Sequence, residues 1–249
     1  MAIDPSDLNR PGYSARHEYN VRLSRYAALR DARRHARRPI VVAAGVVGLV
    51  LLIAQPPAGL MLLIVALALN IDPFSPPHEV VSWGIGADGE AQTARYLKPL
   101  QTCGYFVLND RSVPGRKDNI DHIVVGPTGI FVIESKSYTG RLWRRGGELF
   151  INRRKCTFIV NQAIAEARAV ERALAVELGP VDVEVMPILC VHRAKMPWRP
   201  LVVDGVPIFS GSQVARWIAG GQTVLTPAGA ERLAWRLDMR LPAGAERLP

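Results

Sequence analysis

The stretch IDHIVVGPTGIFVIESK, residues 120–136, decides the fold of this chain. Two runs of β-branched and aliphatic residues flank GPTG, which is typical of two strands joined by a tight turn. Counting outward from the turn brings Asp121 opposite Glu134, and a slip of one residue would separate them. Because side chains alternate along a strand, Lys136 lies beside Glu134 on the same face. The sequence therefore predicts two carboxylates and an ammonium group at one end of a buried hairpin.

These charges are unusual in so apolar a hairpin. Opposed carboxylates repel each other, and burial raises the cost unless a cation lies between them. Lys136 supplies one positive charge, and a divalent metal ion bound by oxygens of Asp121 and Glu134 would supply more. Such an ion activates water, and the lysine positions or polarises that water beside a phosphate. The alternative is a structural ion cluster at a strand end, because Glu-x-Lys alone is a common tripeptide.

The surrounding sequence predicts an α/β domain. We expect a helix after a glycine-rich start, then strands, a long amphipathic helix and further short elements. In chain order these are helix 90–100, strand 105–110, the hairpin, a strand pair around 146–147, helix 160–178, strand 183–193, strand 206–210 and helices 211–220 and 228–241. The order is α-β-β-β-α-β with a tail.

This arrangement resembles the nuclease-related domain (NERD) family of the PD-(D/E)XK nuclease superfamily. The matching stretches are GADGEAQTARYLKPL (86–100), NIDHIVVGPTGIFVIESKSYTGRL (119–142) and NQA (161–163). The resemblance covers residues 84–190. It implies a restriction-endonuclease-like core with a mixed sheet.

The resemblance also implies a catalytic centre. Asp121, Glu134 and Lys136 would form it, with the two acids as ligands of Mg²⁺ or Mn²⁺. Glu90 in the first helix and Gln162 in the helix after the sheet would be auxiliary members. The implied activity is metal-dependent hydrolysis of DNA phosphodiester bonds. The alternative is a non-catalytic nucleic-acid-binding or membrane-scaffold module, which tight, salt-sensitive DNA binding without hydrolysis would favour.

A basic segment follows the hairpin. Residues 141–155 contain six basic residues and one acid, a net charge of +5. We interpret the basic side chains as a phosphate-contacting surface near the site, and a solvated strand face is the alternative. They are Arg141, Arg144, Arg145, Arg153, Arg154 and Lys155.

The cysteines and His122 indicate no metal centre. Cys103, Cys156 and Cys190 are odd in number and widely spaced, so the sequence predicts neither a disulfide nor a zinc site. We expect buried structural thiols in a reducing compartment. His122 follows Asp121 and should point to the opposite face, as a hydrogen-bonded structural residue and not a ligand.

An uncharged segment spans residues 39–71. Its apolar runs, 40–54 and 60–71, are each shorter than the about 20 residues of a span, and QPPAG between them would break a helix. We expect a transmembrane helical hairpin over 39–74 with both ends on one side. The alternative is a single kinked span. Arginines just before the segment indicate a cytoplasmic N-terminus, and we expect the nuclease domain in the cytoplasm, at the plasma membrane.

Charge divides the chain unevenly. The net charge is +9 over 249 residues. Residues 1–38 contain nine arginines and four acids, a net of +5, and we expect a basic cytoplasmic arm that contacts anionic lipid heads near 16–38. A nucleic-acid-binding arm is the alternative. The remaining predicted parts are a linker at 75–83, a nuclease-related domain at 84–225 and a C-terminal helix and tail at 226–249.

One further motif favours a different class of protein. GIGADG, residues 84–89, matches the G-x-G-x-x-G pattern, and Asp110 lies 21 residues beyond Gly89. This is nearly a dinucleotide-binding fingerprint. However, EVVSW before it is a poor buried strand, and Glu90 would place a carboxylate where a pyrophosphate binds. We therefore interpret the motif as a glycine-rich start of a helix and keep a dinucleotide-binding enzyme as a distant alternative.

Overall fold

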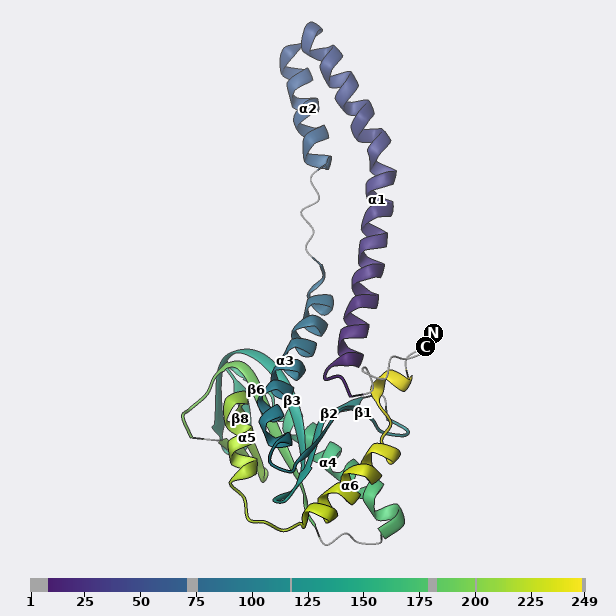
Figure 1. The fold of residues 1–249 in the computed structure, drawn as a ribbon. Helices are drawn as coiled ribbons and strands as arrows, with labels where there is room; N and C mark the ends of the chain where they lie inside the picture. Colours follow the sequence, from purple (N-terminus) through teal and green to yellow (C-terminus); the bar gives the residue numbers. More distant parts are fainter. Residues whose placement is uncertain (1–8, 71–75, 117, 179–182, 200, 248–249) are drawn as a thin grey trace. The chain divides into compact units, whose positions relative to one another are not determined.

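The computed structural model describes residues 9–70, 76–116, 118–178, 183–199 and 201–247. They form a mixed α/β structure with an open sheet of mixed strand direction and a long apolar helix near the N-terminus (Figure 1). Residues 71–75, where the predicted membrane segment meets the predicted linker, lie outside the described residues.

The elements alternate as the sequence predicts over the central part of the chain. The helices are α1 (Tyr13–Ala54), α2 (Pro56–Asn70), α3 (His78–Gln101), α4 (Phe158–Leu178), α5 (Gly211–Ala219), α6 (Pro227–Arg240) and the short 3-10 helix η2 (Gly244–Arg247). The strands are β1 (Phe106–Ser112), β2 (Asn119–Gly126), β3 (Gly129–Arg145), β4 (Glu148–Ile151), β5 (Arg154–Lys155), β6 (Val185–Lys195), β7 (Leu201–Val203) and β8 (Val206–Ser210).

The predicted hairpin is confirmed as β2 and β3. They pair antiparallel with Val125 opposite Ile130 and Gly126 opposite Gly129, so the turn is two residues long. Gly126 cannot carry a side chain, because a Cβ there would lie 2.0 Å from the ring of Tyr105. The register that brings the predicted charges together is therefore fixed at its closed end.

The sheet runs in the order β1-β2-β3-β6-β8-β7. The pairs β3–β6 and β6–β8 are parallel and the other pairs are antiparallel. Beyond the sheet core, β3 continues into a second antiparallel ladder with β4, which pairs in turn with β5. The strand pair predicted around Gly146 and Gly147 is this β3–β4 ladder. The short strand β7 was not predicted.

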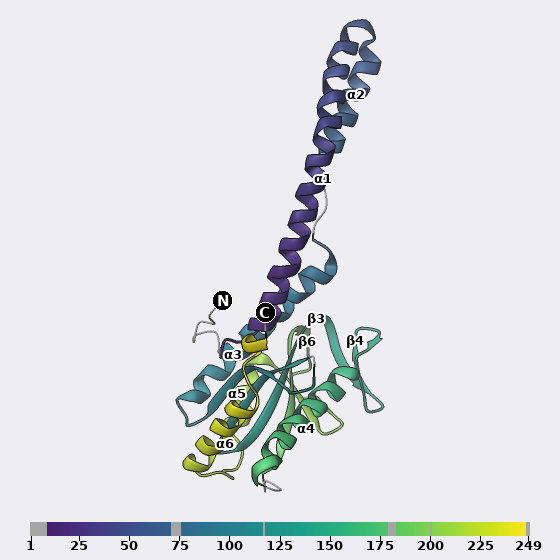
Figure 2. The same ribbon diagram turned by 90° about the vertical axis from the view of Figure 1, so that its right-hand side faces the viewer.

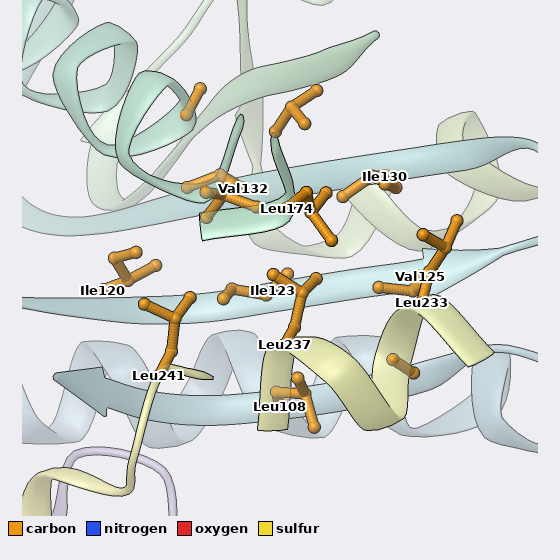
Figure 3. Packing of buried hydrophobic residues seen from close by; sticks show 14 of the residues in the cluster. Leu108, Ile120, Ile123, Val125, Ile130, Val132, Leu174, Leu233, Leu237 and Leu241 are labelled. Atoms are coloured by element: carbon orange, nitrogen blue, oxygen red, sulfur yellow. The ribbon is translucent and has the colours of Figure 1, made fainter. Parts of the chain in front are cut away.

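Alternation along the strands produces two packed faces. Leu97, Phe209 and Val214 belong to the cluster on the face that α3 and α5 cover. On the other face, which α4 and α6 cover (Figure 2), aliphatic residues of β2 and β3 pack against Leu174 of α4 and Leu237 of α6 (Figure 3). Each fully buried aliphatic side chain stabilises the fold by about 1.5–3 kcal/mol. The C-terminal helix α6 is therefore part of the domain core.

Helix α3 corrects the interpretation of GIGADG. The helix begins at His78, not after the glycines, so EVVSW is its first turns and part of the predicted linker is helical. A dinucleotide fingerprint needs a strand before the glycines and a phosphate-binding loop, and neither is present here. The dinucleotide alternative is therefore wrong. Gly89 instead allows close packing, since a Cβ there would lie 2.3 Å from Ser137 Oγ.

Helices α1 and α2 hold the apolar sequence. Helix α1 continues through Pro39, so no helix end separates the basic residues from the apolar ones. By length and composition, α1 is the one helix among the described residues long and apolar enough to cross a membrane, and α2 is shorter at 15 residues. The two helices approach closely where a Cβ on Gly59 would lie 2.8 Å from Gly48 O.

The first described residues belong to the domain and not to a free arm. Asn9 Nδ2 donates to Val107 O (3.0 Å), and the Ser14 amide donates to Asp110 Oδ2 (2.7 Å). Arg16 forms an ion pair with Asp88. Residues 9–16 and 83–249 form one compact unit, and residues 17–82 form another. We call residues 9–16 the N-terminal clasp.

Two of the three cysteines are buried, as the sequence predicts, and one is exposed. Cys156 and Cys190 are buried, but Cys103 is exposed just after the last residue of α3. The prediction of three buried thiols is therefore wrong for Cys103, which lies in the turn between α3 and β1.

Candidate active site

Asp121 lies where the β2–β3 pairing ends. The last paired residues at this end are His122 and Ile133. Beyond them, Asp121 Oδ2 accepts a hydrogen bond from the Ser135 amide at 2.8 Å. The carboxylate thus continues the ladder in place of a backbone carbonyl, and this bond holds it opposite Glu134.

Glu134 and Lys136 are two residues apart on β3, so their side chains lie on the same face of the strand. Lys136 Nζ donates to Glu134 Oε1 as an ion pair. Only 1% of the Glu134 side chain is exposed, against 25% of the Lys136 side chain. Glu134 Oε2 is buried without a hydrogen-bond donor. The predicted triad is therefore assembled in space, with one carboxylate oxygen left for a further positive group.

Helix α4 adds Gln162 and a residue that the sequence did not predict. Gln162 Nε2 donates to Glu166 Oε1 at 3.0 Å, as residues one helical turn apart can. Glu166 is 1% exposed and lies within hydrogen-bonding reach of Glu134. The spacing of the sequence could have revealed Glu166. The buried stripe of α4 contains Ile159, Ala163, Glu166 and Val170, and a glutamate in such a stripe needs a partner.

The carboxyl groups affect one another electrostatically. Burial, and then Asp110 and Glu134, raise the pKa of Glu90 in α3 to about 8. Burial and the neighbouring Glu134 also raise the pKa values of Asp121 and Glu166 well above the usual range. Glu90, Asp121 and Glu166 therefore all interact electrostatically with Glu134, and the cluster favours protons or an added cation.

Lys136 keeps its charge in this cluster. Burial alone would lower the pKa of its ammonium group, but Glu134 and Asp121 outweigh that effect, and the pKa is raised. The lysine is therefore a fixed cation and not a general base at neutral pH.

The carboxylates of the site are possible ligands of a divalent cation. Among the described residues, no three His, Cys, Asp or Glu side chains are arranged as ligands of one ion. Mg²⁺ commonly binds through one or two carboxylates and keeps several waters. Asp121 and the unpartnered Glu134 Oε2 are such a pair, and the surplus of carboxylates favours a cation. The residues therefore fit a magnesium-type site of two carboxylates and water.

The opposite face of the sheet supports the site from behind. His122 is buried, its Nδ1 lies 2.8 Å from Asn109 Oδ1, and burial and His192 lower its pKa to about 3. The prediction of a hydrogen-bonded structural histidine is confirmed. Nearby, Ser135 Oγ donates to Thr93 Oγ1 at 2.8 Å, so the residue whose amide holds Asp121 is itself fixed to α3.

The predicted basic residues lie beyond the site along the same strand. They lie at the end of β3, in the turn between β4 and β5, and in β5. We call residues 141–155, which run from the end of β3 through β5, the β-arm. The six basic residues are all exposed. Lys155 pairs with Glu148, and Arg144 Nη1 donates to Val202 O at 2.9 Å. The structure thus places these residues further along β3 and in the β-arm, and not within the carboxylate cluster.

Comparison with known proteins finds a relative and a family model that each match part of the chain. An uncharacterized protein of Bacillus anthracis is 36% identical over 90 residues, which is 35% of this chain and 41% of that protein. The chain therefore spans less than half the length of this relative. No solved structure gives a significant match. Residues 85–203 match the family model described as nuclease-related domain. They include the hairpin, the carboxylate cluster and the β-arm, so the match to the nuclease-related domain falls on the part of the chain that carries the resemblance.

Proposed function

We propose that this protein is a membrane-anchored, divalent-metal-dependent nuclease that hydrolyses DNA phosphodiester bonds. The observation that carries the proposal is the meeting of Asp121, Glu134 and Lys136 at one end of the β2–β3 hairpin. The order α3-β1-β2-β3-α4-β6 around them, with β3 and β6 parallel, supports a restriction-endonuclease-like core.

Each residue has a chemical role in this proposal. Asp121 and Glu134 hold Mg²⁺ or Mn²⁺, which supplies a Lewis acid and lowers the pKa of water. Lys136, held in place by Glu134, donates to a phosphate oxygen and stabilises negative charge as it develops. Gln162 lines the site from α4, and Glu90 adds negative charge from α3.

The N-terminal clasp supports a hairpin topology for the apolar segment. Asn9 and Ser14 hydrogen-bond to Val107 and Asp110, so the clasp and the domain belong on one side of a membrane. A single span between them would separate these partners. Residues 40–54 rise about 22 Å as a helix, less than the about 30 Å of a bilayer core, so flanking side chains must extend each helix.

The charge around α1 supports a cytoplasmic position and contact with anionic lipid. Five arginines and Val41 and Val42 line a groove of about 810 Å³ within residues 17–82. Cations beside apolar residues suit the boundary between lipid phosphates and acyl chains. The arginines are Arg30, Arg33, Arg34, Arg37 and Arg38. By the positive-inside rule this end faces the cytoplasm of a plasma membrane.

The test is cleavage of DNA by the full chain in mild detergent, with and without Mg²⁺. Asp121→Asn and Lys136→Met should each lower the rate by about 100-fold or more, because each removes a fixed charge at the reacting phosphate. Glu231→Gln, an exposed acid on α6, is the matched control and should leave the rate unchanged. Cleavage that persists in both site variants would overturn the assignment.

A non-catalytic nucleic-acid-binding or membrane-scaffold module is the second candidate. It is favoured by one observation, that no three metal-ligating side chains converge among the described residues. Salt-sensitive binding of DNA by the full chain, with neither hydrolysis nor Mg²⁺ uptake, would select it.

A further inference from the structure

We infer that the β-arm and the loop after β6 bind a single strand of nucleic acid, with unpaired bases stacked on Trp143 and Trp198. This inference rests on the proposed nuclease function. It narrows the substrate of that nuclease from DNA in general to strands whose bases are exposed. The inference is carried by a groove, by two tryptophans and by the way that the arm is held.

The groove lies between the β-arm and the end of β6 and has a volume of about 840 Å³. Three cations contribute to it: Arg141 and Arg144 from β3, and Lys195 from β6. None of the described residues that line it is acidic. A phosphate backbone is the polyanion that such a lining attracts.

Trp143, in the wall of this groove, offers only its apolar ring. The ring stacks on Phe150 with centroids 4.8 Å apart, and its indole N–H already donates to Asn152 O at 2.7 Å. What remains is a fixed aromatic surface beside cations. Such surfaces recognise bases by stacking, which tolerates any sequence.

Trp198 provides a second aromatic surface next to the groove. It is 80% exposed and follows Pro197, which lines the groove. The guanidinium carbon of Arg199 lies 4.8 Å from the Trp198 ring centroid. The large apolar ring of Trp198 would therefore gain from burial against a stacked base.

The arm is built to hold its shape. Gly140 has a φ of +133° and a Cβ there would lie 2.3 Å from the Asn152 amide. The Arg141 amide donates to Asn152 Oδ1 at 2.9 Å, which closes the arm around this contact. Arg144 joins it to β7 through Val202 O. A preorganised groove loses little entropy on binding.

Base stacking distinguishes a single strand from a duplex. In a duplex, neighbouring base pairs cover each base face, so only phosphates remain for the cations. In a single strand, bases can turn onto the two tryptophans while the same cations contact phosphates. The groove and the candidate active site lie along the same strand, β3. Arg141 is five residues beyond Lys136, which corresponds to about 17 Å along an extended strand.

The experiment is fluorescence anisotropy with the full chain in mild detergent and EDTA, so that no hydrolysis occurs. The probes are a labelled single-stranded oligonucleotide and its duplex. We expect tighter binding of the single strand, and about tenfold weaker single-strand binding by Trp198→Ala, with duplex binding changed less than about twofold. Trp198→Phe should retain most of the affinity. Trp235→Ala, 64% exposed on α6, is the matched control and should bind like the wild type.

Two results would overturn the inference: equal affinity for both probes, or an unchanged single-strand affinity in Trp198→Ala. Circular dichroism of each variant confirms folding. The outcome is separate from that of the proposed function, because Asp121→Asn should bind the single strand as well as the wild type does. Single-strand preference without cleavage in Mg²⁺ would refute the nuclease and keep this surface, and cleavage without the preference would do the reverse.

Discussion

At the scale of single residues, the site was predictable where spacing alone determines proximity. Asp121, Glu134 and Lys136 follow from counting outward from a turn, and the observed register agrees. Glu166 was missed because it reaches the cluster through the packing of α4 on β3, which no local count reveals. The coupling of Glu90 to the cluster likewise depends on how α3 packs.

Glu166→Gln should stabilise the protein at neutral and higher pH. The pKa of Glu166 is raised in the folded protein, whereas in the unfolded chain a glutamate has a pKa of about 4.3. Above that pH the unfolded chain loses its proton more readily than the folded protein, so Glu166 lowers the stability of the fold as the pH rises. A glutamine avoids that cost and can donate to the unpaired Glu134 Oε2. We expect a melting temperature higher by roughly 3 °C or more near pH 8 in EDTA, and little difference near pH 5.

Glu171→Gln, an exposed position of the same helix, is the control for this substitution. A lower melting temperature of Glu166→Gln near pH 8 would contradict the stated electrostatic cost. Scanning calorimetry or circular dichroism in EDTA measures both variants.

The cluster also predicts how stability depends on pH and metal. Glu90 has a pKa of about 8 in the folded protein, so its contribution is present at low pH and is lost as the pH rises from about 4.5 through about 8. We expect the melting temperature in EDTA to fall over this range and Glu90→Gln to flatten the fall. Mg²⁺ should raise the melting temperature more near pH 8.5 than near pH 5.5. Equal effects at both pH values would argue against binding at these carboxylates.

At the scale of elements, the α-β-β-β-α-β order was predictable because apolar alternation and amphipathic spacing are strong in β2, β3 and α4. Helix α3 was misjudged because three glycines give its first half a poor helix propensity. Packing overrides that propensity, since Gly89 allows the helix to approach Ser137. Strand β7 has three residues, too few for a periodic signal.

Two alanine substitutions in α3 should therefore have opposite effects. At Gly86 nothing lies within 4 Å of a new Cβ, so Gly86→Ala should stabilise the protein by about 0.5–1 kcal/mol. At Gly89 the Cβ would meet Ser137 Oγ, so Gly89→Ala should destabilise it by about 1–3 kcal/mol. Adding Ser137→Ala should recover much of that loss. Urea unfolding measures each variant, and the same sign at both glycines would refute the assigned packing.

At the scale of the whole molecule, the native cysteines test the proposed topology. Cys103 is exposed while Cys156 and Cys190 are buried. A membrane-impermeant thiol reagent should therefore modify one thiol per chain in inverted membrane vesicles and none in intact cells. Cys103→Ser should abolish the labelling. Labelling in intact cells would place the domain outside.

The N-terminal clasp makes the compact unit of residues 9–16 and 83–249 discontinuous in sequence, with residues 17–82 inserted into it. Among its hydrogen bonds, Ser14 with Asp110 joins residues 96 positions apart, and Asn9 with Asn109 joins residues 100 positions apart. During synthesis the clasp leaves the ribosome before β1. It can form its hydrogen bonds only after the apolar helices α1 and α2 and then β1 have been made. In the proposed topology, a chain threaded the wrong way leaves the clasp and its partners on opposite sides of the bilayer. The domain would then lack its first residues, so faulty threading would itself yield an unstable protein open to proteolysis.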